Sequence, residues 1–115
     1  MMSIEDLRQQ PLPFVAADRE GLIVEINDHF QSVYGWDIED LRGQSISMIL
    51  PESFRDSHHL GFSRFRITGE SQILNHPLKL ATICKDQRQV MSEHFIVAQR
   101  QGEAWIFAAT LRPLE

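Results

Sequence analysis

The sequence contains little cysteine and no long hydrophobic run, and both absences limit where the protein works. Cys84 is the only cysteine among 115 residues. No disulfide can form within the chain, so a reducing compartment is the expected setting. No apolar run approaches the ~20 residues that span a membrane. The polar segment 1–10 also lacks the apolar centre of a signal peptide. We therefore expect a cytoplasmic domain with no direct membrane contact.

Basic side chains are scarce in the first half of the chain. Residues 1–57 contain four Lys or Arg against eleven Asp or Glu, and the whole chain has a net charge of −5. A nucleic-acid binder needs a basic face that displaces counterions from phosphates. The acidic half is typical of a solvated helical surface, and no nucleic-acid partner is expected.

Motifs for metal binding and phosphate binding are also missing. None of the five histidines forms the i, i+4 pair of a helical metal site. His58 and His59 are adjacent and point to different faces of a helix, so they are poorly placed to chelate one ion. There is no glycine-rich phosphate loop and no evident Ser-His-Asp set. We expect neither a metal site nor a catalytic residue.

The length and composition fit one globular domain. Apolar residues make up 43% of the chain and charged residues 23%, which are ordinary values for a folded protein. A chain of 115 residues is long enough for one hydrophobic core. No internal repeat, linker or low-complexity tract divides it. We expect a single domain over 1–115, with its core at about 12–112.

The hydrophobic pattern predicts an α+β fold with five strands. Ser3 and Asp6 form a candidate capping box for a short first helix. Asn27 or Asp28 caps a later helix that Gly35 ends, and 53–68 is the longest helical candidate. Strands are expected at 13–17, 22–26, 72–83, 90–98 and 104–111, with Pro77 interrupting the third. The last three strands are linked by hairpins, which predicts an antiparallel sheet with the helices on one face.

The strand 104–111 is apolar on both of its alternating sets of residues. A strand of this kind is usually buried on both faces of its sheet. One face is expected to cover a pocket, and the other to be covered by the N-terminal segment, a partner domain or a second copy of the chain, of which we predict the second copy. The alternative is that Ile4 and Leu7 fold back over this face within one chain. The predicted dimer face is Ile4, Leu7, Trp105, Phe107, Ala109 and Leu111.

Several short strings, in their order and spacing, resemble the PAS family over about 12–112. They include Gly21-Leu22-Ile23-Val24-Glu25-Ile26-Asn27, Tyr34-Gly35-Trp36, Glu39-Asp40-Leu41-Arg42-Gly43, Met48-Ile49-Leu50-Pro51, Arg64-Phe65 and Thr68-Gly69-Glu70. Lys85-Asp86 stands where that family has a Lys-Asp-Gly hairpin. The resemblance implies strand order 2-1-5-4-3 around a pocket. It also implies a sensory role in which the domain dimerises and regulates a kinase, as in two-component systems, a cyclase or a chemoreceptor.

A long aromatic stripe supplies the predicted pocket. Phe54, His58 and Phe62 recur at helical spacing, with Phe65 three residues further on. This stripe is expected to face the core. The predicted ligand pocket is lined by Phe54, His58, Phe62, Phe65, Leu78, Leu80, Phe95, Ile106 and Ala108.

Three functions follow as hypotheses. The first is a signal-sensing domain that binds a small ligand or a protein partner. The second is a haem-based gas or redox sensor, because His58 and Arg64 resemble the iron ligand and a propionate partner of haem-binding PAS domains. In those domains, however, an arginine stands where this chain has Leu78. The third is a small enzyme with His58 or His94 as general base. Flavin photochemistry is not expected, because the chain lacks the Asn-Cys-Arg string that the light-oxygen-voltage subfamily requires.

Overall fold

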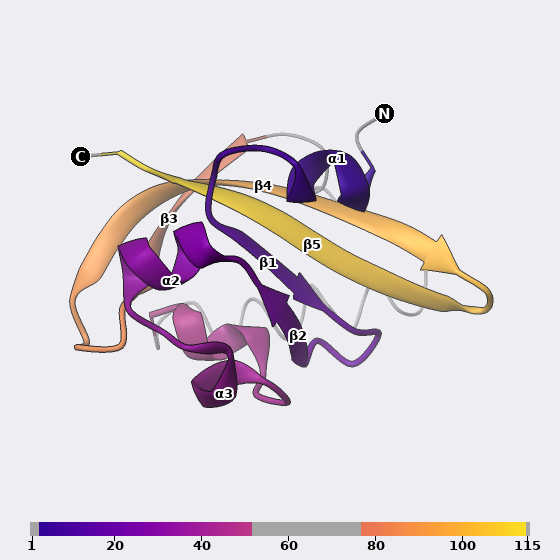
Figure 1. Cartoon of the computed structure of the whole chain (residues 1–115), viewed down its shortest axis with the longest axis horizontal. Coiled ribbons are helices and arrows are strands. Elements are labelled where there is room, and N and C mark those ends of the chain that lie inside the picture. The colour runs from indigo at the N-terminus through magenta and orange to yellow at the C-terminus, as the bar shows by residue number, and fades with distance from the viewer. Residues whose placement is uncertain (1–2, 52–76, 115) are drawn as a thin grey trace.

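The computed structural model describes residues 3–51 and 77–114, which form one five-stranded antiparallel sheet with short helices (Figure 1). The strand order is β2-β1-β5-β4-β3, which confirms the predicted fold. In chain order, the elements are α1 (Ile4–Arg8), β1 (Phe14–Ala17), β2 (Ile23–Ile26), α2 (Asp28–Tyr34), α3 (Ile38–Leu41), the 3-10 helix η1 (Ile46–Ile49), β3 (Pro77–Ile83), β4 (Gln89–Gln101) and β5 (Ala104–Pro113).

The two long strands β4 and β5 form the centre of the sheet. They pair in unbroken register from Ser92 and Pro113 to Gln101 and Ala104. β1 joins β5 on one side and β3 joins β4 on the other. The outer edge of β2 is covered by the segment 43–46, since Ile23 N–H donates to the Gln44 carbonyl at 2.8 Å. The sheet is therefore continuous from β2 to β3, and its β2 edge is covered.

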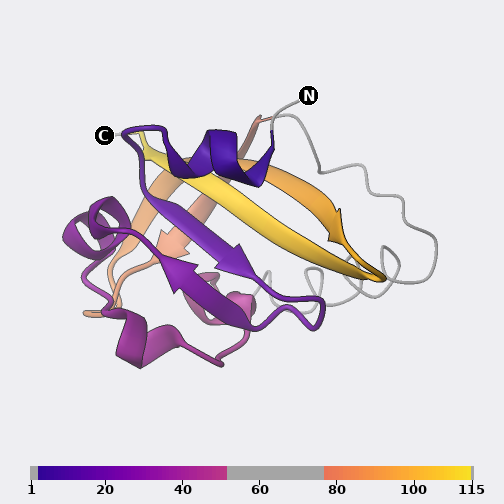
Figure 2. The same ribbon diagram turned by 45° about the vertical axis from the view of Figure 1, so that its right-hand side comes forward.

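Helices lie on both faces of the sheet, as Figure 2 shows, whereas the sequence predicts them on one face; α1 is the helix that lies on the other side. We call the face beneath α2, α3 and η1 the inner face; it carries Val15, Ile96 and Ala109. We call the face beneath α1 the outer face; it carries Ala16, Val97 and Ala108. Because successive residues of a strand point to opposite faces, these sets identify the face of every other residue on the same strand.

The sequence contains a cap for each of the first two helices. The Ser3 hydroxyl accepts from Asp6 N–H at 3.1 Å, and Ser3 N–H donates to the Asp6 carboxylate at 2.9 Å, which confirms the predicted capping box. Asn27 caps α2 by accepting from Phe30 N–H at 2.9 Å. The same oxygen accepts from Phe14 N–H at 3.0 Å. Asn27 thus joins the start of α2 to the start of β1.

The first helix covers the outer face within a single chain. Ile4 is 5% exposed and Leu7 is fully buried, and both pack with Phe14 and Ala108. Arg8 forms ion pairs with Glu5 and Glu25 and lies over the Phe14 ring. The alternative weighed for Ile4 and Leu7, that they fold back over the sheet, is what the structure shows.

Candidate functional site

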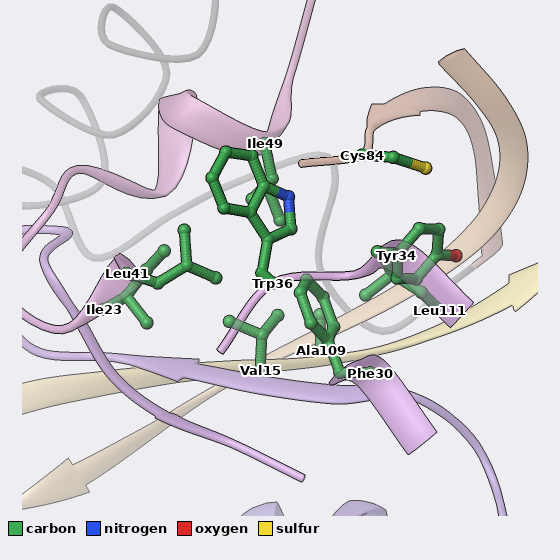
Figure 3. Close-up of a cluster of buried hydrophobic side chains, with 10 residues drawn as sticks. All are labelled: Val15, Ile23, Phe30, Tyr34, Trp36, Leu41, Ile49, Cys84, Ala109 and Leu111. Carbon is green, nitrogen blue, oxygen red and sulfur yellow. The ribbon is translucent and has the colours of Figure 1, made fainter. Parts of the chain in front are cut away.

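The inner face holds the larger of the two apolar clusters that the described residues form. Figure 3 shows ten of its buried side chains gathered between the sheet and the short helices. The rings of Phe30 and Tyr34, one helical turn apart on α2, lie 5.0 Å apart between centroids. Tyr34 is 1% exposed, so the phenol is held within the core. The cluster comprises Val15, Ile23, Phe30, Tyr34, Trp36, Leu41, Ile49, Cys84, Ala109 and Leu111.

A patch of uncharged polar side chains interrupts this apolar face. It consists of Tyr34, Thr82, Ser92 and His94, and we call it the polar patch. The Tyr34 hydroxyl lies 2.6 Å from Ser92 Oγ, and Thr82 Oγ1 lies 3.0 Å from His94 Nε2. Ser92 also donates to the Val90 carbonyl at 3.3 Å, which leaves the Tyr34 hydroxyl as the donor in its bond to Ser92. Exposure of these side chains does not exceed 4%.

The register of the sheet brings the patch together. Thr82 on β3 is opposite Val90, whereas His94 on β4 is opposite Leu78. Ser92 and His94 alternate with outward residues and therefore point to the same face as Ile96, the inner face. A buried polar group costs free energy unless it is hydrogen-bonded, and here each side chain has a partner in the patch: Tyr34 pairs with Ser92, and Thr82 pairs with His94.

Burial keeps the two titratable members of the patch uncharged at neutral pH. It lowers the pKa of His94 from 6.5 to about 4, although a hydrogen bond with the Leu80 backbone acts in the opposite direction. Burial raises the pKa of Tyr34 above 10.0, and hydrogen bonds with Ser92 and Thr82 oppose that rise. An unprotonated imidazole and a protonated phenol can each donate and accept hydrogen bonds.

Contacts between the β3–β4 hairpin and the helices hold Tyr34 in place. Lys85 N–H donates to the Tyr34 carbonyl at 3.0 Å, and the Lys85 ammonium lies 2.9 Å from the Asp40 carboxylate. Trp36 Nε1 donates to the Ile83 carbonyl at 2.9 Å. Gly35, at φ 83°, turns the chain between these two bonds. The end of α2 is therefore fastened to the two strands that carry the rest of the patch.

The predicted pocket residues are divided between the two faces. Leu78 and Leu80, half-buried, are opposite His94 and Ser92 in the register and lie on the inner face. Phe95, Ile106 and Ala108 lie on the outer face with α1, so the prediction that they face a pocket beneath the helices is wrong in orientation. The reason is parity: a shift of one residue moves every side chain of a strand to the other face.

The predicted dimer face is likewise divided. Ala109 and Leu111 belong to the inner cluster, and Trp105 and Phe107 share their parity on β5. The expectation that these four residues form an outer face is therefore wrong. Both parity sets of β5 are apolar, so hydrophobic alternation provides no signal for which set faces the helices. Ile4 and Leu7 do lie on the outer face, where they are buried within the chain.

The aromatic stripe lies outside the described residues. Phe54, His58, Phe62, Phe65 and Arg64 all fall in 52–76, so the haem hypothesis and four of the nine predicted pocket residues are not assessed by this structure. Within 3–51 and 77–114, no group of three metal-ligating side chains comes together. Cys84 is buried in the inner cluster. None of the helices in the described ranges is both long and apolar enough to cross a membrane.

The polar patch was missed by sequence reasoning. The sequence singles out His94 only as a candidate general base, and it gives no reason to group it with Tyr34, Thr82 and Ser92. The signal was present in part, because Ser92 and His94 lie at every second position with Val90 and Ile96 and so share a face of β4 with them. That parity matches a strand whose inward set is mixed polar and apolar. The other set of alternating residues on β4 contains Phe95 and Val97, and these apolar side chains favoured the opposite orientation of the strand.

Comparison with known proteins places this fold in a family. A family model described as the PAS fold matches residues 7–104. An uncharacterised protein of Azorhizobium caulinodans is 28% identical over 101 residues, which cover 87% of this chain. Those residues cover 14% of that protein, so the chain spans about one seventh of the curated relative it matches.

Solved structures show the same fold at low sequence identity. The PAS domain of an HTR-like protein from Haloarcula marismortui has a TM-score of 0.75 at 18% identity, covering 96% of this chain and 88% of its own. The PAS domain of the Cronobacter turicensis RpfR quorum-sensing receptor, in complex with C12:0, has a TM-score of 0.68 at 12% identity, covering 93% and 97%. With the family model spanning most of the sequence, the chain belongs to the PAS family.

Proposed function

We propose that this chain is a sensory PAS domain that binds a small ligand against the inner face of its sheet. The observation that carries the proposal is the polar patch, which places four hydrogen-bonding side chains inside an otherwise apolar cluster. Ligand sites in proteins combine apolar walls with a few convergent polar groups. The related RpfR domain, whose structure is in complex with C12:0, supports a ligand at this fold.

The proposed output is a change in self-association or in docking to an attached module. β4 and β5 carry both faces: Ile96 and Ala109 point inward, and their neighbours Val97 and Ala108 point toward α1. A ligand that alters the twist of these strands would therefore alter how α1 packs on the outer face. A ligand shifts such an equilibrium only by its difference in affinity for the two states. A homodimer and a kinase, cyclase or chemoreceptor output belong to this proposal.

A regulatory role is favoured over catalysis. The enzyme hypothesis named His94 as a general base, and a base works best with a pKa near the operating pH. Burial lowers the pKa of His94 to about 4, so its imidazole is a weak proton acceptor at neutral pH. His58, the other candidate base, lies outside the described residues. We therefore propose a non-enzymatic sensor.

Two-dimensional NMR of the ¹⁵N-labelled chain tests this function. The chain is titrated with a library of small molecules, and its sedimentation is measured with and without each molecule that binds. We expect shifts in β3, β4 and α2 together with a ligand-dependent change in sedimentation. Shifts confined to α1 and the outer-face strand residues would contradict binding at the inner face. Binding with unchanged sedimentation would contradict the self-association output.

A further inference from the structure

The described inner face has a charge pattern that favours one chemical class of ligand. Among the described strand residues whose parity points inward, only Arg100 is charged at neutral pH. Arg100 is exposed at the end of the β4–β5 hairpin, where it donates to the Gly102 carbonyl. It lies six residues from His94, about 20 Å along an extended strand. The strands around the polar patch therefore provide donors and acceptors without a nearby countercharge.

Access to the patch differs along β3. Thr82 is fully buried, whereas Leu78 and Leu80 on the same face are only half-buried. Leu78 is opposite His94, so the imidazole lies at the boundary between the closed and the more accessible part of the inner face. Ile96, next to His94 on that face, is also only half-buried. A molecule that meets His94 would thus contact aliphatic side chains with the rest of its surface.

An uncharged polar group of a ligand can take the place of a hydrogen-bond partner within the patch. Each hydroxyl of Tyr34, Thr82 and Ser92 can donate one proton and accept others, and a neutral imidazole does both. A hydroxyl, carbonyl or amide group can replace one of these partners with no change in charge. Next to the patch, the inward residues of the described strands provide no cation for a carboxylate or phosphate. An unpaired buried charge is far more costly than a buried dipole.

We propose that the polar patch selects an uncharged ligand, one that combines an aliphatic body with a hydroxyl, carbonyl or amide group. This inference rests on the proposed function and adds the class of molecule that is sensed. The aliphatic body lies along Leu78, Leu80 and Ile96, and the polar group reaches His94 and Thr82. Selection by charge is a property of this chain's own strand residues, because the fold alone does not determine that His94 and Thr82 stand at these positions.

Matched pairs of probes test the selection on the native chain. Each pair has one shape and differs in charge: dodecanamide with dodecanoate, octanamide with octanoate, and benzamide with benzoate. Binding is followed by NMR at about pH 8, where carboxylic acids are ionised. We expect the amide of at least one aliphatic pair to bind at least about tenfold more tightly than its carboxylate.

The possible outcomes separate this inference from the proposed function. Equal or tighter binding of the carboxylates, with shifts at the inner face, would overturn the charge selection and leave the sensory function intact. No shift from any probe at millimolar concentration would overturn both. An amide preference with shifts at the outer face would overturn the assignment to the patch.

Variants then connect the preference to particular atoms. Thr82→Val removes the hydroxyl and keeps the shape, and we expect it to weaken amide binding severalfold while carboxylate binding changes less. Met91→Ala is the matched control, because Met91 neighbours Ser92 on β4, points to the outer face and is 47% exposed. Equal losses in both variants would contradict a role for the patch. The native-chain comparison remains decisive even where Thr82→Val does not fold.

Discussion

The two faces of the sheet are both well packed, but they are built differently. On the outer face α1 packs on apolar strand residues, Ile4 N–H donates to the Gln99 side chain at 3.1 Å, and the ion pair of Arg8 with Glu25 lies at the surface. The inner face buries a hydrogen-bonded set of four polar side chains within a larger apolar cluster. A largely apolar interface holds a helix without burying many polar groups, whereas buried polar groups must all find hydrogen-bond partners. The comparison supports the proposal that the inner face, besides stabilising the fold, serves recognition, whereas the outer face serves stability alone.

The largest expected effect compares one buried side chain from each face. Phe30→Ala, on the inner face, is expected to lower the free energy of unfolding by about 3–5 kcal/mol, since Phe30 is fully buried in the larger cluster. Leu7→Ala is expected to cost less, about 2–3 kcal/mol, because α1 can detach while the sheet stays folded. Urea unfolding measures both. A larger loss for Leu7→Ala would contradict this expectation and show that the packing of α1 stabilises the fold more than the inner cluster does.

The second effect is acid sensitivity at the inner face. The folded state holds the pKa of His94 at about 4, below its ordinary 6.5, so the folded chain resists protonation that the unfolded chain accepts. The contribution of the lowered His94 pKa to the free energy of unfolding is fully present above pH 6.5. It is lost as the pH falls toward 4, by about 3 kcal/mol in total. Stability measured from neutral pH down to pH 4 should fall less steeply in His94→Gln than in the native chain. Parallel curves for the two proteins would contradict a buried, neutral His94.

The third effect is the coupling between the hydroxyls of Tyr34 and Ser92. A double-mutant cycle with Tyr34→Phe and Ser92→Ala isolates their 2.6 Å hydrogen bond. We expect a coupling free energy of about 1 kcal/mol, the net value typical of a buried hydrogen bond. Denaturant unfolding of the four proteins provides it. Additive losses would show that the two hydroxyls act independently, against the description of one connected patch.

The smallest effect is expected at the surface of the outer face. Arg8 and Glu25 are more than a third exposed, and exposed ion pairs contribute about 0.2–1 kcal/mol. Glu25→Gln should lower stability by an amount in this range, and added salt should reduce the difference from the native chain. Arg42, which pairs with Glu39 on the surface, offers a matched control as Arg42→Gln. A salt-independent loss of several kcal/mol in the free energy of unfolding would mean that the packing of the outer face depends on this ion pair.

Sequence reasoning predicted local structure better than orientation. Ser3, Asn27 and Gly35 sit at helix ends for reasons that act within a few residues, so their roles follow from the sequence alone. The glycine that the family places after Lys85-Asp86 is Gln87 here, and the turn still forms with Gln87 at φ 74°. Local signals of this kind tolerate single exceptions.

The faces of β4 and β5 could not be predicted in the same way. On β5 both alternating sets are apolar, so burial on either side satisfies the pattern. On β4 the inward set contains Ser92 and His94, whose burial depends on partners from α2 and β3 that are distant in sequence. Hydrophobicity therefore favoured Phe95 as the inward residue. A polar site built from three elements leaves only a partial periodic signal in any one of them.

The proposed recognition by the inner face depends most on where a bound molecule lies. Nuclear Overhauser contacts between a bound amide probe and methyl-labelled protein measure this directly. We predict contacts to the methyl groups of Leu78, Leu80 and Ile96. Contacts to Val97, Ala108 and Ile106 in their place would put the ligand on the outer face and contradict recognition by the polar patch.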